Sequence, residues 1–176
     1  KWLDTMLNVI VEQMAETGVD GCVKISRSQR MRMLRSSLNE IHPNELGRGE
    51  KIGRGKFGEV FEGTYHRNAV ALKLIEGTIG AKDKKRIETM LDEAAILQSL
   101  SHPNVVQLLG VNRMDSPPCL VLELLNGGNL FNFLYRSEST QPLDRKWAVA
   151  LLKDVAEAIE YLHGVSISHR DLKSPN

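Results

Sequence analysis

The chain has 176 residues, 41% of them apolar and 26% charged, and its formal net charge is +1. This composition is typical of an ordinary globular protein with enough apolar residues for one core. The near-zero net charge excludes a general attraction to nucleic acid, so any basic binding surface has to be local. No apolar run approaches the roughly 20 residues of a membrane span.

The first 45 residues are expected to form an N-terminal segment. Between residues 2 and 16 an apolar residue recurs every three or four positions, which predicts a short amphipathic helix. The basic segment 24–35 carries five Lys or Arg side chains and no acidic one. Such runs are usually a solvated helix face or linker; the alternative is a contact with an anionic membrane surface or a phosphorylated partner. His42-Pro43-Asn44 is typical of a loop, so we expect a boundary between segment 1–45 and a domain of residues 46–176.

From residue 46 the pattern predicts strands first and helices later. Strands alternate apolar and polar residues or form short apolar runs, whereas helices repeat apolar residues every three or four positions. A short turn at residues 66–68 separates the first two clear strands, and Asn129 can cap a short helix. Gly164 is expected to end the last helix. The expected strands are 59–65, 69–75, 105–111 and 120–124, and the expected helices are 82–100, 130–135 and 143–163.

Three glycines, Gly53, Gly55 and Gly58, lie in a loop that the strand pattern places inside a hairpin. Glycines at this spacing let the backbone approach a phosphate, because no side chain blocks it and positive φ is available. Alone, the pattern fits a plain structural turn equally well, and it also opens dinucleotide-binding domains. Those domains need a helix after the glycines and an acidic residue about 20 positions further on. Here a strand follows and Thr78 occupies that position, which argues against a dinucleotide site.

Lys73 lies in the apolar run of the strand that follows the hairpin turn. A buried ammonium group needs an anionic partner, whereas a lysine at a strand edge reaches water along its own stem. The strand by itself favours the second interpretation, a lysine at a strand edge. Glu93, near the apolar face of the helix 82–100, offers the partner. The two residues predict an ion pair between helix and sheet, with phosphates over the glycine loop sharing the lysine.

The third motif is His169-Arg170-Asp171-Leu172-Lys173-Ser174-Pro175-Asn176. With it the chain resembles a eukaryotic protein kinase domain. Four motifs stand in that family's order: the glycine loop, the Val-Ala-Leu-Lys run, Glu93 ahead of a His-Pro-Asn turn, and His-Arg-Asp-Leu. Lys173 is typical of the serine/threonine branch. The sequence Lys-Ser-Pro-Asn is similar to that of the tyrosine-kinase-like group, which is mostly serine/threonine specific.

The resemblance implies an α+β fold with two lobes. The N-terminal lobe is expected to hold an antiparallel five-stranded sheet with one helix, and only the first helices of the C-terminal lobe are expected in residues 46–176. The implied activity is transfer of the γ-phosphoryl group of ATP to Ser or Thr hydroxyls of a protein substrate, with Mg²⁺ as cofactor and a role in signalling.

The resemblance also assigns roles to residues. Lys73 is expected to hold the α- and β-phosphates, with Glu93 fixing its position. Asp171 is expected to accept or orient the proton of the substrate hydroxyl, Lys173 to stabilise charge on the γ-phosphoryl group, and Asn176 to hold Mg²⁺. The other residues expected to contact ATP are Ile52, Gly53, Arg54, Gly55, Lys56, Phe57 and Gly58 over the phosphates, Val60 and Ala71 above the adenine, Leu122, Glu123 and Leu125 around the hinge, and Asn129 near the ribose.

Other expectations concern the ends of the chain and its setting. The sequence begins at Lys1, so the N-terminus is expected to be a cut end, and membrane attachment of the parent protein stays open. No Asp-Phe-Gly segment follows Asn176, so we expect an active parent kinase and an inactive 176-residue piece. The alternative is a truncated pseudokinase that acts as a binding module through the apolar face of helix 143–163, against which the intact catalytic positions argue. Cys22 and Cys119 form no metal or redox motif, which indicates reduced thiols in a cytoplasmic protein, while one bridge between them stays open.

Overall fold

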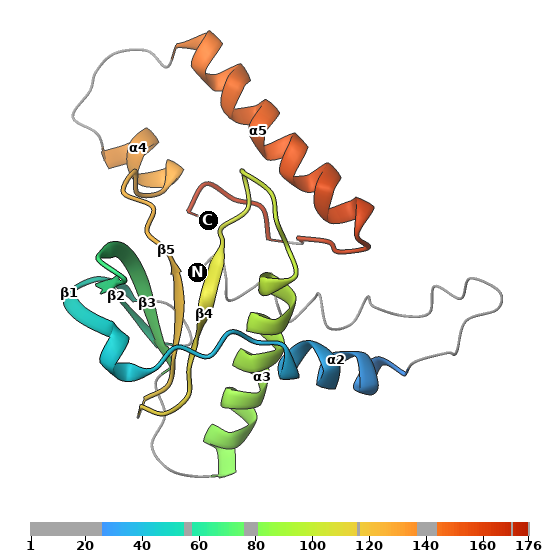
Figure 1. Ribbon diagram of the computed structural model, residues 1–176. Coiled ribbons are helices and arrows are strands. Elements are labelled where there is room, and N and C mark those ends of the chain that lie inside the picture. The colour runs from blue at the N-terminus through green and yellow to red at the C-terminus, as the bar shows by residue number, and fades with distance from the viewer. Residues whose placement is uncertain are drawn as a thin grey trace. The chain divides into compact units, whose positions relative to one another are not determined.

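The computed structural model of the chain describes residues 26–54, 58–75, 81–115, 117–136, 144–169 and 171–175 (Figure 1). The helix expected over residues 2–16 lies outside them. The chain forms two compact units. Of the described residues, the sheet unit comprises those up to Ser101 together with Val106–Leu125, and the helical unit comprises His102–Val105 and those from Asn126 onward. Among the described residues, no helix has both the length and the apolar character needed to cross a membrane.

Five antiparallel strands form the sheet unit, in the spatial order β1-β2-β3-β5-β4. This confirms the predicted sheet. The β2–β3 turn consists of His66 and Arg67, whose φ angles are 48° and 67°. Positive φ at both central residues is the turn geometry that matches the twist of two paired strands. The strands are β1 (Leu46–Arg54), β2 (Gly58–Tyr65), β3 (Asn68–Ile75), β4 (Leu108–Asn112) and β5 (Cys119–Glu123).

Two helices and one short 3-10 turn complete the sheet unit: α2 (Arg27–Ser36), η1 (Pro43–Glu45) and α3 (Ala81–Gln98). The predicted helix 82–100 is therefore present and ends two residues early. The predicted strand 105–111 was wrong for residues 105–107, because β4 begins only at Leu108. The backbone N–H of Val105 donates to the carbonyl of His102 over 3.1 Å, which closes a turn where the sequence favoured a strand.

The two faces of the sheet have different neighbours, because side chains alternate along each strand. Lys73 lies between Leu72 and Leu74 and therefore on the opposite face from both. It contacts Glu93 of α3, so α3 packs on the Lys73 face, where it also contacts β4. The other face carries a buried cluster, called here the outer cluster. Its members are Ile41, Phe61, Val70, Leu72, Leu74, Cys119 and Val121.

The helical unit contains α4 (Leu130–Arg136) and α5 (Arg145–Gly164), which confirms both predicted helices. Asp144 caps α5, because its Oδ1 accepts from the backbone N–H of Lys146 over 3.0 Å. Few α5 side chains are buried, and Trp147 is 40% exposed while it stacks on Phe133 with ring centroids 4.8 Å apart. The predicted apolar stripe of α5 is therefore largely open among the described residues.

Candidate active site

Lys73 occupies the middle of β3, the central strand of the sheet. Its Nζ lies 3.1 Å from Oε1 of Glu93, and the two side chains are 5% and 6% exposed. A charge at this depth is tolerated only when a partner of opposite sign compensates its lost hydration. The predicted ion pair between helix and sheet is present, and it brings a cation and an anion together inside the sheet unit.

The residues expected around the nucleotide line up across the strands. Lys73 pairs in register with Val60 on β2, and Val60 pairs with Gly53 on β1. Residues directly opposite in an antiparallel pair point to the same face, so these three form one row on the face that α3 covers. Ala71 lies two residues before Lys73 and shares its face, with Leu122 opposite on β5. The structure therefore gathers five of the predicted nucleotide contacts on one face.

The glycine loop joins β1 to β2 as a hairpin, as the strand pattern predicted. Residues 55–57 lie outside the described part of the chain. Gly58 has a φ of 155°, a value that residues with a side chain rarely adopt. A Cβ built on Gly53 would meet a single described neighbour within 4 Å, the Val60 Cβ at 3.9 Å. Among the described residues, the space beside the Gly53 backbone is therefore left open.

The side chains on either side of Gly53 are exposed. Ile52 is 51% exposed, and Arg54 is exposed as well. Lys51 forms an ion pair with Glu59 across the hairpin, and this hydrogen bond lowers the pKa of the Glu59 carboxyl below its usual range. The pair holds β1 and β2 together next to the loop.

The end of β5 is fixed to the residue that precedes β4. Glu123 donates its backbone N–H to the carbonyl of Gln107 over 3.0 Å, and its Oε1 accepts from the backbone N–H of Gln107 over 2.7 Å. Leu125, two residues further on, is 62% exposed. The segment expected to read the adenine thus begins at an anchored residue.

In the helical unit, Asp171 is held by a buried histidine. Its backbone N–H donates to Nδ1 of His169 over 3.2 Å, and His169 is 3% exposed. Burial lowers the pKa of His169, so the imidazole is neutral and its Nδ1 can accept. Lys173 forms an ion pair with Oδ2 of Asp171, which brings together the two predicted catalytic residues of this loop. Arg170 and Asn176, the predicted metal ligand, lie outside the described residues.

The segment that holds Asp171 and Lys173, called here the catalytic loop, is attached to the start of α4. The backbone N–H of Phe131 donates to the carbonyl of Ser174 over 2.8 Å. Asn129 caps this helix, because its Oδ1 accepts from the backbone N–H of Asn132 over 2.8 Å. The cap confirms the structural prediction for Asn129, while its contact with a ribose stays a prediction.

Comparison with known proteins agrees with this geometry. Residues 46–176 match the family described as protein tyrosine and serine/threonine kinase.

The chain belongs to this kinase family.

Its relatives include kinases of both specificities. The chain is 38% identical over 135 residues to the serine/threonine-protein kinase CTR1 of Arabidopsis thaliana, which covers 75% of this chain and 16% of CTR1. It is 36% identical over 140 residues to the tyrosine-protein kinase Abl of Drosophila melanogaster, covering 78% of the chain and 8% of Abl. It is 35% identical over 136 residues to the tyrosine-protein kinase csk-1 of Caenorhabditis elegans, and this match covers 77% of the chain and 24% of csk-1. The chain thus spans less than a quarter of the length of these relatives.

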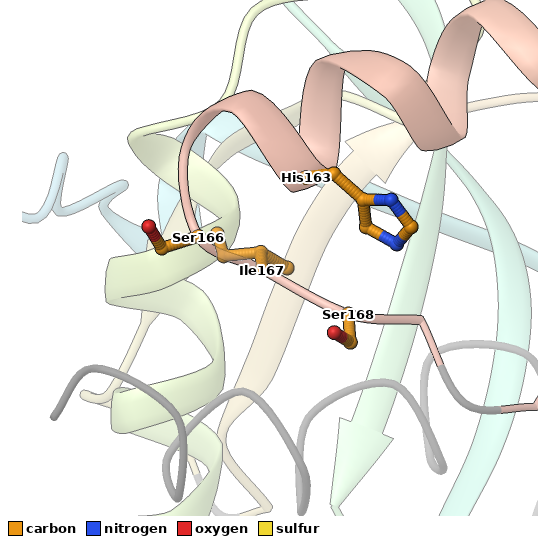
Figure 2. A pocket seen from close by; sticks show the side chains of 4 residues that line it. All are labelled: His163, Ser166, Ile167 and Ser168. Atoms are coloured by element: carbon orange, nitrogen blue, oxygen red, sulfur yellow. The ribbon is translucent and has the colours of Figure 1, made fainter.

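An open depression lies beyond the C-terminal end of α5 and is lined by His163, Ser166, Ile167 and Ser168 (Figure 2). None of these is a residue predicted for this kinase site. Ser166 has a φ of 60° and turns the chain from α5 toward the catalytic loop. The depression therefore lies at this turn and contains none of the predicted site residues.

A local turn closed by a histidine side chain occurs three times and was not predicted from the sequence. In three of the four His-x-Asn or His-x-Asp stretches of the sequence, the Nδ1 atom of the histidine accepts from the backbone N–H two residues later, which closes a tight turn as an Asx side chain does. The fourth stretch, His66-Arg67-Asn68, contains the β2–β3 turn. The signal was readable, because the sequence contains His-Pro-Asn twice and His-Arg-Asp once. The pairs are His42 with Asn44 (3.2 Å), His102 with Asn104 (3.1 Å) and His169 with Asp171 (3.2 Å).

Sequence reasoning also left residues 26–41 outside the site. The structure packs α2 against α3, the helix that carries Glu93. The readable signal was the Ser26-x-x-Gln29 spacing, because Ser26 and Gln29 form a reciprocal capping box at the start of α2. The expected division of the chain at residue 45 stays a prediction.

Proposed function

We propose that this chain supplies the ATP-binding lobe and the catalytic loop of a protein kinase that phosphorylates Ser and Thr residues. The observation that carries the proposal is the buried Lys73–Glu93 pair on the same sheet face as Val60 and Gly53. A buried cation on the sheet face that also carries the backbone of Gly53 is what a polyphosphate requires.

The described residues fit the nucleotide expected from the family. Lys73 would bind the α- and β-phosphates, and Glu93 keeps its ammonium group from turning toward water. Val60 and Ala71 offer apolar surface for the adenine. ATP, when bound, supplies the γ-phosphoryl group that is transferred. The protein would contribute by positioning the nucleotide and neutralising the charge of its phosphates, and these side chains would do both.

The catalytic loop supplies the proton chemistry in this proposal. Asp171 would accept or orient the proton of the substrate hydroxyl, and its position is fixed through its backbone by the neutral His169. Lys173 balances the charge of this carboxylate, and its ammonium group would neutralise charge on the transferred group. Mg²⁺ would be held by Asn176, and among the described residues no cluster of three His, Cys, Asp or Glu side chains forms a separate metal site.

Nucleotide binding tests the proposal directly. Titration of the purified chain with ATP and Mg²⁺ should show binding that the Lys73→Met variant weakens by about tenfold or more, since a hydrogen bond to a charged group contributes about 1.5–3 kcal/mol. An Arg113→Gln variant, which removes an exposed ion pair of the same unit, serves as the control. Equal affinities for the wild type and Lys73→Met would refute the proposed role.

Phosphoryl transfer is a separate test. We propose that the parent protein is active and that the 176 residues alone are not, because the Asp-Phe-Gly segment is not among them. Labelled ATP and a generic basic protein, together with matched peptides that carry Ser, Thr or Tyr, measure both activity and specificity. Robust incorporation by the 176-residue chain would overturn the claim of inactivity, and preference of the parent for Tyr would overturn the claim of Ser/Thr specificity.

The open apolar stripe of α5, with Trp147 and Leu152 40% and 67% exposed, favours a second candidate function as a binding module. The reading frame of the parent discriminates between the two. An Asp-Phe-Gly segment within a few tens of residues of Asn176 favours the enzyme, and a stop codon favours the module. A membrane contact of segment 24–35 and a cytoplasmic location stay proposals that fractionation of the parent protein would test.

A further inference from the structure

Residues 26–41 form a clamp on α3, and we use this name for them below. The clamp begins with α2, whose Met31 is buried, continues through Leu38 and ends at Ile41, which is 1% exposed in the outer cluster. It lies entirely before residue 46, where the match to the kinase family begins. Its effect on the kinase fold is therefore not explained by the family match.

The first contact of the clamp is made by Arg35. Its Nε donates to Oδ1 of Asp92 over 2.6 Å, and its Nη2 donates to the carbonyl of Glu88 over 3.2 Å. The side chains of Arg35 and Asp92 are 32% and 20% exposed, so water screens the pair only in part. One guanidinium group thus holds two successive turns of α3, and Asp92 is the residue directly before Glu93.

The second contact holds the other end of α3. The backbone N–H of Asn39 donates to Oε1 of Gln98 over 2.8 Å, and Nε2 of Gln98 donates to the carbonyl of Ser37 over 2.7 Å. The amide of Gln98 is therefore used as both donor and acceptor. Together with Arg35, these bonds hold α3 on both sides of Glu93.

The clamp is anchored to the sheet independently of α3. Segment 39–41 pairs with Val111 of β4, where the N–H of Ile41 donates to Val111 and the N–H of Val111 donates to Asn39 over 2.9 Å and 2.8 Å. Nδ2 of Asn39 donates to the carbonyl of Leu109 over 2.7 Å, and Arg113 pairs with Glu40. The clamp therefore connects α3 to β4 by a route that does not pass through Lys73.

We propose that Arg35 is a positioning residue that sets the place of Glu93 relative to Lys73 and thereby tunes nucleotide binding. The inference rests on the proposed function for its last step. The buried pair Lys73–Glu93 joins α3 to β3, and a helix displaced by a fraction of a turn would separate the two atoms that now lie 3.1 Å apart. The clamp opposes that displacement, so a change before residue 46 acts on the active site through α3.

The test compares two arginines in the full 176-residue chain, Arg35 of the clamp and Arg113 of the sheet side. Arg35→Gln removes the contact of the clamp with α3. Arg113→Gln removes a comparable, partly exposed ion pair with Glu40, where the backbone hydrogen bonds between segment 39–41 and Val111 remain, and therefore serves as the matched control. Hydrogen exchange of the backbone amides of residues 88–98 reports the position of α3 without any nucleotide. Titration with ATP and Mg²⁺ reports the consequence for binding.

Arg35→Gln should speed exchange in residues 88–98 and weaken nucleotide binding by about fivefold, the factor that corresponds to about 1 kcal/mol. Arg35→Lys keeps the charge but loses the two-donor geometry of the guanidinium group. Its exchange rate and nucleotide affinity should lie between those of Arg35→Gln and the wild type. The charge-swapped pair Arg35→Asp with Asp92→Arg should recover protection that either single change loses, which a general loss of stability would not do.

Unchanged exchange in Arg35→Gln, or an equal effect of Arg113→Gln, would overturn the inference. Should Arg35→Gln not fold, Arg35→Lys against Arg113→Lys decides by the same readouts. Failure of the proposed function looks different: Lys73→Met then leaves nucleotide affinity unchanged, while the exchange of residues 88–98 still decides whether the clamp positions α3.

Discussion

Replacing Glu93 by Leu tests how strongly the buried ion pair supports the fold. The change removes the carboxylate and leaves the ammonium group of Lys73 at a site where the side chain is 5% exposed. Removing one partner of a buried pair costs about 3–5 kcal/mol, since the remaining charge keeps its desolvation penalty and loses its compensation. A domain whose total stability is about 5–15 kcal/mol should lose a large part of it.

The double variant Lys73→Met with Glu93→Leu separates charge from packing. It removes both charges and fills the same space with apolar side chains, an exchange that is often neutral or stabilising by about 1–4 kcal/mol. The double variant should therefore be more stable than Glu93→Leu alone, although it carries one substitution more. It should also fail to bind nucleotide, because the cation for the phosphates is gone.

Urea denaturation followed by far-ultraviolet circular dichroism measures the free energy of unfolding of the wild type, Glu93→Leu and the double variant. Equal m-values show that the same unfolding transition is compared. Arg113→Gln is the control. The side chains of Arg113 and Glu40 are 40% and 35% exposed, and exposed ion pairs contribute about 0–1 kcal/mol. The reasoning is refuted if Glu93→Leu costs no more than this control, or if the double variant is the least stable of all.

Three further predictions follow from single residues. Gly63→Ala should cost about 1–3 kcal/mol in urea denaturation, because the new Cβ would lie 2.6 Å from Leu72 Cδ1 and 2.7 Å from a backbone oxygen, whereas Gly127→Ala, with no described atom within 4 Å, should cost far less; equal costs would contradict this. Burial raises the pKa of the Cys119 thiol to about 11, so an alkylating reagent at about pH 8 should modify it only in denaturant, and labelling of the folded chain at this peptide would show the burial to be wrong. Because burial lowers the pKa of His169, the unfolded state binds more protons and the free energy of unfolding should fall as the pH drops through about 6.5; His169→Asn should flatten this dependence, and an unchanged slope would assign it to other groups.

The sequence predicts the hairpin and the sheet of this chain well, because their signals are local. Alternation with period two placed β2 and β3 within one residue of their observed bounds. Glu93 was predicted as the partner of Lys73 since an acid near the apolar face of a helix has to be compensated. The start of β4 was not predicted, because the propensity of Val105 and Val106 for strands competes with a turn made by His102.

The clamp could not be predicted from local patterns. Arg35 and Asp92 are 57 positions apart, and nothing in the basic segment distinguishes this arginine from Arg30 or Arg32, which are exposed. A charge run has no periodicity that selects one side chain for a tertiary contact. The positions of the loop residues 55–57 and of Asn176 lie outside the described part of the chain, so their predicted contacts with phosphate and Mg²⁺ stay predictions.

The outer cluster has a consequence for which insertions this chain tolerates. Phe61 is buried there and the guanidinium carbon of Arg48 lies 3.7 Å from its ring centroid, so the outer face fixes which side of β2 Phe61 occupies. Its neighbour Val60 then has to face Lys73. A single residue inserted within β2 would exchange the two faces and bring a bulky ring onto the face that carries Lys73, whereas two inserted residues would preserve the alternation. Insertions of an even number of residues in β2 should thus be tolerated better than insertions of an odd number, and the outer cluster enforces this rule from the opposite face.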